Sequence, residues 1–231
     1  MFMIGLALAI LPAGQTALAA QASKCPPYSK PITLDFKLLN PAPIYNNRLN
    51  ILGIRNLFRS HTEAVLGPHE SALGITYAET VYSAEANSRA EEVRGGYCVY
   101  LTEMDISFGW KRMSVYVASE FQPETCEYNA VLDHENQHVT INNTALKEYA
   151  PRFRAEVERV LQAQQPVFTS NPQAGVDAGL AAVERRMSAV LNEFQNTMAK
   201  RNAPLDSDSN YSETGKLCTN WNGAKGARRT E

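Results

Sequence analysis

The stretch AVLDHENQHV, residues 130–139, places two histidines four residues apart with an acid directly after the first. It lies in a run whose apolar residues recur at steps of three and four from Val131 to Val160, which predicts a long α-helix. On such a helix His134 and His138 point the same way from consecutive turns, so their imidazole nitrogens can converge on one cation. The stretch therefore sets the helical half of the fold and supplies the first candidate site.

The acid within this pattern, Glu135, completes the sequence His-Glu-x-x-His. A glutamate beside the first histidine cannot reach the ion comfortably, but it can accept a proton from water held there. The two histidines could instead be ordinary polar residues on the buried stripe of the helix. Burying two imidazoles requires two sets of hydrogen-bond partners, however, and packs no better than leucine. The pattern therefore favours a metal site.

A second helix follows the first. Residues 164–175 are rich in proline and polar residues and predict a turn, and a new apolar stripe runs from Leu180 to Met198 until Pro204 stops it. The two stripes predict a long antiparallel helical hairpin. Pro151 lies inside the first helix and should kink it.

A catalytic zinc ion takes three protein ligands and keeps one position open, so the two histidines need a partner. With a rise of ~1.5 Å per residue, the hairpin brings residues 204–211, a polar segment where the chain leaves the second helix, level with the histidines. Asp206 is the first choice for the third ligand, followed by Asp208 and Tyr211. Glu184 enters only if the proline inside the first helix kinks it sharply.

The first half of the chain predicts a sheet. Alternating runs begin at Ile32, Gly74, Gly96 and Arg112. A Gly-Trp-Lys sequence at residues 109–111 is compatible with a tight hairpin between the last two runs, and residues 45–66 include a short helix. The predicted fold is α+β, with a small, mostly antiparallel sheet followed by the helical hairpin.

The first 22 residues are typical of a secretory signal peptide, because an apolar run is followed by the small residues of TALAAQA. The apolar run is shorter than the ~20 residues that span a membrane as a helix. Residues 23–221 then form a single domain, and residues 222–231 a flexible tail. The 22 basic and 24 acidic residues give a net charge of −2 and show no long basic run, which argues against nucleic acid as a partner. These features predict a periplasmic or secreted protein of the bacterial cell envelope.

Four cysteines are present, an even number that permits two disulfides in an oxidising compartment. The hairpin geometry places Cys218 near Cys126, which leaves Cys25 to pair with Cys98. A bridge from Cys98 to Cys126 is also sterically reasonable, so the pairing stays open.

The order of a strand, a helix carrying HENQH and a returning helix resembles the zincin metallopeptidases. More narrowly, residues 74–218 are similar to a family of small exported bacterial proteins described as zinc-dependent proteases of unknown function. The segments that carry this resemblance are LDHENQHVTINNTALKEY, residues 132–149, and LDSDSNYSETGKLC, residues 205–218.

The resemblance implies that His134 and His138 bind zinc and that Glu135 is the general base. Asp206 matches an aspartate of the family, whereas Tyr211 stands where related proteins carry a histidine. We therefore expect an exported zinc-dependent metallopeptidase that hydrolyses peptide or protein substrates, with Tyr211 assisting the oxyanion. A peptide could pair with the strand at residues 114–118. The alternatives are a non-catalytic cell-envelope binding protein on a zincin scaffold and a zinc amidase acting on cell-wall peptides.

Overall fold

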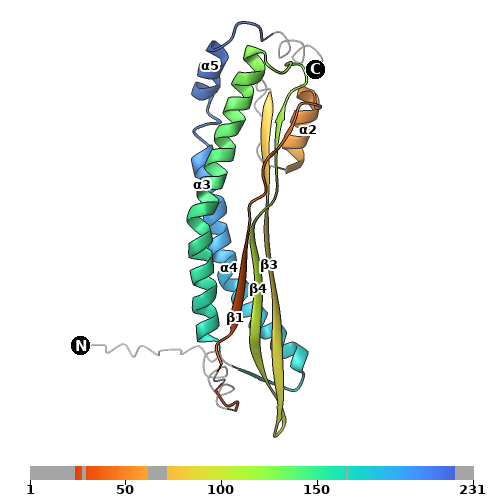
Figure 1. Cartoon of the computed structure of the whole chain (residues 1–231), viewed down its shortest axis with the longest axis vertical. Coiled ribbons are helices and arrows are strands. Elements are labelled where there is room, and N and C mark those ends of the chain that lie inside the picture. The colour runs from red at the N-terminus through yellow and green to blue at the C-terminus, as the bar shows by residue number, and fades with distance from the viewer. Residues whose placement is uncertain (1–23, 28–29, 62–71, 165, 222–231) are drawn as a thin grey trace, which may run out of the picture. The chain divides into compact units, whose positions relative to one another are not determined.

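The computed structural model describes residues 24–27, 30–61, 72–164 and 166–221. Figure 1 labels the elements, which in chain order are β1 (Thr33–Leu39), β2 (Ile44–Asn46), α2 (Ile51–His61), β3 (Gly74–Val93), β4 (Gly96–Val117), α3 (Cys126–Ala163), β5 (Val167–Thr169), α4 (Pro172–Asn202) and α5 (Asp208–Lys216). The signal peptide predicted for residues 1–22 and the tail predicted for residues 222–231 lie outside the described residues.

The chain divides into two compact units, and five of the elements, β1, β3, β4, α3 and α4, contribute to both. Unit 1 comprises the chain up to Asp35 together with Ala84–Asp105 and Val157–Arg186, and unit 2 comprises Phe36–Ser83, Ile106–Glu156 and Met187–Glu231. The histidine pair and the predicted third ligand all belong to unit 2. That residues 23–221 form a single domain stays a prediction.

The fold is α+β, but the prediction of a mostly antiparallel sheet is wrong. The sheet has five strands, and the three on its main path, in the order β1-β4-β2, run parallel. Ile44 of β2 lies opposite Ser114 of β4, and Asn46 lies opposite Tyr116. Alternating hydrophobicity identifies a strand but gives neither its partner nor its direction. The pairing of β2 with β4 could not be inferred because α2 and β3 separate the two strands in the sequence.

The predicted hairpin at residues 109–111 is also wrong, because β4 continues through them as one strand. Gly109 has a φ of 142°, and a Cβ atom there would overlap the carbonyl oxygen of Leu39 in β1. The glycine therefore permits close approach of a neighbouring strand rather than a turn. The turn that joins β3 to β4 lies at residues 94–95, where Gly95 has a φ of 89°.

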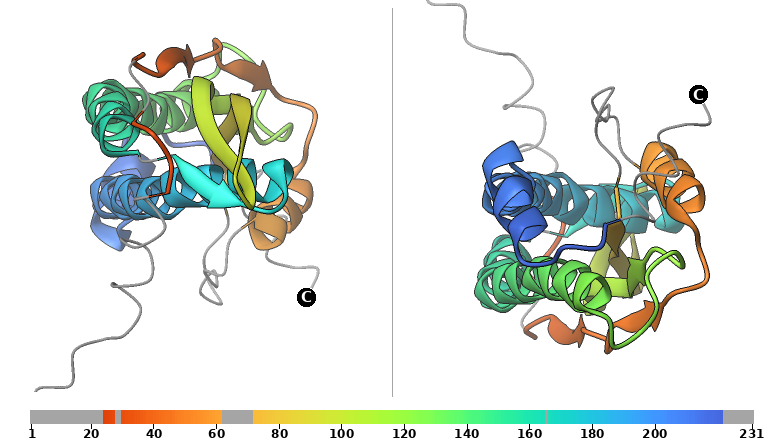
Figure 2. Two further views of the ribbon diagram at one scale, coloured as in Figure 1. Left: turned by 90° about the horizontal axis from the view of Figure 1, so that it is seen from below. Right: turned by 90° about the horizontal axis from the view of Figure 1, so that it is seen from above.

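Both long helices of the predicted hairpin are present. α3 continues through Pro151 and starts at Cys126, where the hydroxyl of Thr125 accepts a hydrogen bond from the backbone N–H of Tyr128 at 3.3 Å. Within unit 2, α3 and α4 lie side by side (Figure 2), and the hydroxyls of Tyr149 and Thr197 are 2.8 Å apart across them. The antiparallel pairing expected from the two stripes therefore brings the start of α3 close to the end of α4.

The segment after α4 is more ordered than the loop suggested by its composition. Ser207 caps α5 by accepting a hydrogen bond from the backbone N–H of Asn210, and Asp208 stands in the first turn, where the helix dipole favours an acid. The Cys126–Cys218 disulfide then ties the chain after α5 to the start of α3. The second disulfide joins Cys25 to Cys98 within unit 1, so the structure contains the first of the two pairings considered.

An aromatic core in unit 2 packs the helices onto the sheet. Phe108 of β4 stacks on Phe153 of α3 with the ring centroids 4.3 Å apart, and Phe194 of α4 contacts Phe108 edge-on at 5.4 Å. All three side chains are fully buried. Their contacts fix α3 and α4 against β4. The candidate site lies near the C-terminal end of α4, so it is built on helices that are held in place by this core.

Candidate metal centre

Three potential metal ligands converge in unit 2. The Nε2 atoms of His134 and His138 lie 3.5 and 3.0 Å from the same oxygen, Oδ1 of Asp206. One ligand atom from each residue can be chosen so that all lie within 4.8 Å of one another. Both histidines are buried, whereas the aspartate side chain is 46% exposed. The two histidines thus form the buried side of the site, and the site is open to solvent at Asp206.

This spacing fits a divalent cation. With zinc–ligand bonds of ~2.1 Å at tetrahedral angles, neighbouring ligand atoms lie about 3.4 Å apart. The two distances to Asp206 Oδ1, 3.0 and 3.5 Å, bracket that value. Two imidazole nitrogens and one carboxylate oxygen are also a donor set that zinc accepts with a fourth position open. The three residues thus form a group that could hold a metal ion.

The turn after α4 delivers Asp206 to the histidines. The backbone carbonyl of Asn202, the last residue of α4, accepts hydrogen bonds from the N–H groups of Leu205 and Asp206 at 2.9 and 3.3 Å. Leu205 is buried and anchors this turn. Beyond α5, Glu127 accepts a hydrogen bond from the backbone N–H of Asn220 at 2.8 Å, next to the disulfide. The segment that carries Asp206 is therefore anchored before it, at the end of α4, and after it, beyond α5.

The charges of the site are coupled. Burial alone would lower the pKa of His138, but its hydrogen bond to Asp206 and the nearby charge of Glu135 raise the pKa above its ordinary value. Burial would raise the pKa of Asp206, yet its bonds to both histidines hold that pKa far below the usual range. The arrangement thus favours positive charge on His138 and negative charge on Asp206.

Glu135 lies on the neighbouring face of α3 and packs against β3. Its Oε2 accepts a hydrogen bond of 2.8 Å from the hydroxyl of Thr76, and the side chain is only 4% exposed. Burial raises the pKa of Glu135, and the nearby histidines partly oppose that effect. A carboxylate with a raised pKa is suited to accept and return a proton near neutral pH.

Gly74, the first residue of β3, has no side chain, and Glu135 occupies the space that a side chain there would fill. A Cβ atom at this position would lie 2.6 Å from Glu135 Oε1 and 2.7 Å from a methyl carbon of Val131. We therefore expect Gly74→Ala to displace the glutamate and to lower the free energy of unfolding by about 1–3 kcal/mol, measured by urea denaturation. The ligand residues are untouched, so metal binding should persist.

Gly215 in α5 provides a matched control for this prediction. A Cβ atom there would meet nothing within 4 Å, so Gly215→Ala should leave the stability unchanged or raise it by up to about 1 kcal/mol. Equal stabilities of the two alanine variants would show that Gly74 is not needed to make room for Glu135.

Tyr211 of α5 contacts two of the three ligand residues. Its hydroxyl donates a hydrogen bond of 3.0 Å to Asp206 Oδ1, and its ring stacks on His134 with the centroids 5.3 Å apart. The side chain is 46% exposed. Tyr211 therefore lies at the open edge of the centre, where it orients the aspartate and covers the first histidine.

Among the described residues, the metal-competent group comprises His134, His138 and Asp206, and it includes neither Asp208 nor Glu184. The hydrogen-bond partners around it were missed from the sequence. The helix rise does place Asn202 level with His138 along the axis of the hairpin, but an asparagine at a helix end does not by itself indicate a functional site. Thr76 could not be found, because its approach to α3 depends on how the sheet is paired.

The strand proposed to hold a peptide is already occupied on one side. Ile44, Tyr45 and Asn46 of β2 pair with residues 114–116 of β4, and Ala118 N–H bonds to the carbonyl of Leu73 at 2.8 Å. A peptide could therefore take the β2 side of residues 114–116 only if β2 left the sheet.

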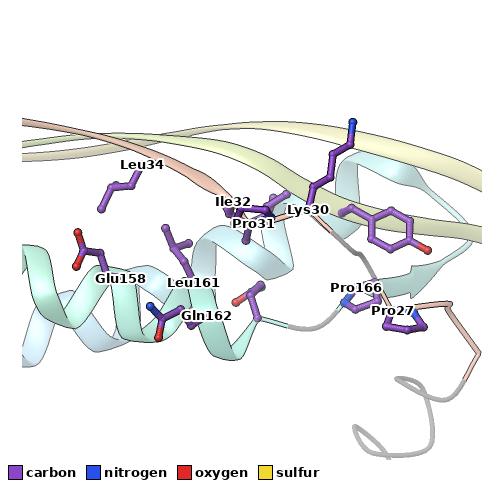
Figure 3. Close-up of a pocket in the computed structure, with 12 residues that line it drawn as sticks. Pro27, Lys30, Pro31, Ile32, Leu34, Glu158, Leu161, Gln162 and Pro166 are labelled. Atoms are coloured by element: carbon purple, nitrogen blue, oxygen red, sulfur yellow. The ribbon is translucent and has the colours of Figure 1, made fainter.

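A separate cavity of about 540 Å³ lies in unit 1 and contains none of the candidate site residues (Figure 3). Its walls come from β1 and the segment before it, β4, the end of α3 and the start of the following loop. Pro27, Pro31 and Leu161 supply apolar surface, while Lys30 and Glu158 supply the charged groups. Its lining includes no histidine or cysteine.

Within the described parts of the chain, no helix has the length and apolar character needed to cross a membrane. The two disulfides fit an extracellular or periplasmic protein, since such bonds persist in oxidising compartments. Comparison of the chain with protein-family models, curated proteins and solved structures gives no match.

Proposed function

We propose that this protein is an exported zinc-dependent hydrolase that cleaves peptide bonds. The observation that carries the proposal is the convergence of His134 Nε2 and His138 Nε2 on one oxygen of Asp206, at 3.5 and 3.0 Å. A buried carboxylate, Glu135, lies beside the first histidine and is held by a hydroxyl. Three ligands with an adjacent base are the minimum that metal-assisted hydrolysis of an amide requires.

Each residue then has a defined task. A zinc ion at this centre would polarise the scissile carbonyl and lower the pKa of a coordinated water. Glu135 accepts the proton of the attacking water and returns it to the leaving amine, while Thr76 orients its carboxylate. On substrate binding the hydroxyl of Tyr211, which donates to Asp206 in this structure, would turn to the developing oxyanion on the side where the centre is open.

The proposal is tested with protein purified from an oxidising compartment without chelators. Metal analysis should give about one zinc per chain, and a mixed peptide library should be cleaved, as read by mass spectrometry. A chelator should stop cleavage, and added zinc should restore it. Cleavage of cell-wall peptides alone would identify an amidase. Metal-free protein without peptide cleavage, even after zinc is added, would reject the hydrolase and leave a binding protein.

A further inference from the structure

We propose that Asn202 is a positioning residue that fixes His138 in the tautomer whose Nε2 is free to bind metal, and that Asn142 locks Asn202 in place. The inference rests on the proposed metal centre but concerns residues that do not touch the ion. It follows from the hydrogen bonds that join Asn142 to Asn202 and Asn202 to His138.

The orientation of the Asn202 amide is determined by its neighbours. Its Nδ2 donates to the backbone carbonyl of Met198 at 2.9 Å and to Oδ1 of Asn142 at 3.0 Å, which uses both amide hydrogens. A flipped amide would set its oxygen against the Met198 carbonyl, and a carbonyl cannot donate. Oδ1 of Asn202 therefore faces Nδ1 of His138, at 2.8 Å, as an acceptor.

This acceptor requires a proton on Nδ1 of His138. With Nδ1 protonated, the neutral ring carries its lone pair on Nε2, the atom that lies 3.0 Å from Asp206 Oδ1. A lone pair facing a carboxylate oxygen at that distance is favourable only when a metal ion or a proton lies between them, so Nε2 is the nitrogen at which a metal ion would replace a proton. The hydrogen bond at Nδ1 thus leaves Nε2 as the nitrogen that would bind a metal ion.

The surroundings protect this arrangement from water. His138 is 9% exposed and Asn142 is 7% exposed. His134 is held differently, because its Nδ1 is buried without a hydrogen-bond partner among the described residues. The two histidines therefore play unequal parts: His138 is set in its binding form by the protein, while His134 depends on Asp206 and Tyr211 for its orientation.

Asn202 also links two of the ligands. Its side chain sets the tautomer of His138, and its backbone carbonyl accepts the N–H of Asp206 at 3.3 Å. The residue that ends α4 thus positions one ligand through its amide oxygen and another through the turn that it begins. A substitution of the side chain alone separates the two effects, since the backbone contact remains.

The test compares Asn202→Leu, which removes the acceptor, with Asn202→Asp, which keeps an acceptor oxygen but loses the donors. Asn196→Leu changes an exposed asparagine of the same helix and is the control. Zinc affinity is measured by competition with a chromophoric chelator. The tautomer of the neutral His138 ring is read from its ¹⁵N chemical shifts in the metal-free protein, a readout that needs neither zinc nor substrate.

We expect the neutral His138 ring of metal-free wild-type protein to carry its proton on Nδ1. Asn202→Leu should lose this preference and bind zinc about 10- to 100-fold more weakly, while Asn202→Asp should keep it and Asn196→Leu should match the wild type in both readouts. A neutral wild-type ring protonated on Nε2 alone, or equal tautomers and affinities in Asn202→Leu and wild type, would overturn the inference. A wild type that binds no zinc but shows the Nδ1 proton would reject the proposed function and leave the positioning role intact.

Discussion

Glu135→Gln is expected to retain zinc and to lower kcat/KM for peptide cleavage by about 10²- to 10⁴-fold, the range that a general base contributes. Glutamine matches the shape of glutamate and can still bond to the hydroxyl of Thr76, so the packing of α3 on β3 should persist. It cannot accept the proton of the attacking water. The measurement pairs metal content with steady-state kinetics on a peptide found in the library digest.

Glu148→Gln is the control for this experiment. Glu148 is an exposed glutamate of the same helix that pairs with Arg201 at 2.6 Å, outside the candidate centre. Its replacement should leave zinc content and kcat/KM at wild-type values. Full activity in Glu135→Gln would show that the base lies elsewhere, even if the metal centre is present.

Asp206→Ala is expected to weaken zinc binding by about 100-fold or more, because it removes one of three protein ligands, and structural zinc sites bind the ion with on the order of 10–16 kcal/mol in total. The remaining histidines would keep residual affinity. The loss should be seen in a competition titration and as lower zinc content after gel filtration. It also removes the shared acceptor of both histidines and Tyr211, so their rings should become less well ordered.

Asp208→Ala provides the comparison, since Asp208 lies two residues further on, in the first turn of α5. Zinc affinity in this variant should equal that of the wild type, with at most a loss of stability of about 1 kcal/mol from the helix N-terminus. If Asp208→Ala lost zinc and Asp206→Ala kept it, the third ligand would have been assigned to the wrong residue.

The histidine pair shows what the sequence could predict about the site. Helical spacing alone places His134 and His138 on one face, and the constant rise of two antiparallel helices brings Asp206 to their height. The same reasoning places Cys218 near Cys126, and that pairing is confirmed. These predictions hold because a helix has one fixed geometry, so distances along it follow from residue numbers.

The sheet shows where such reasoning stops. A strand can pair with any other strand on either side and in either direction, and residue spacing does not distinguish these possibilities. The parallel pairing of β2 with β4 and the close pass of Leu39 over Gly109 depend on contacts between distant parts of the chain. The pairing of the sheet places Thr76 of β3 next to Glu135. This hydrogen-bond partner of the proposed base therefore could not be predicted from the sequence.

Asn202 is an intermediate case. Its height beside His138 followed from the helix rise, yet its role depends on which amide atom faces the ring. That orientation is settled by the Met198 carbonyl and Asn142, two contacts that spacing does not reveal. Hydrogen-bond partners of metal ligands are therefore harder to predict from sequence than the ligands themselves.

The most direct test of the central claim is a crystal of the zinc-loaded protein measured on both sides of the zinc absorption edge. We expect one anomalous peak about 2.0–2.2 Å from Nε2 of His134, Nε2 of His138 and a carboxylate oxygen of Asp206. A zinc-soaked crystal with no peak at these atoms, or with its peak at other residues, would contradict the account.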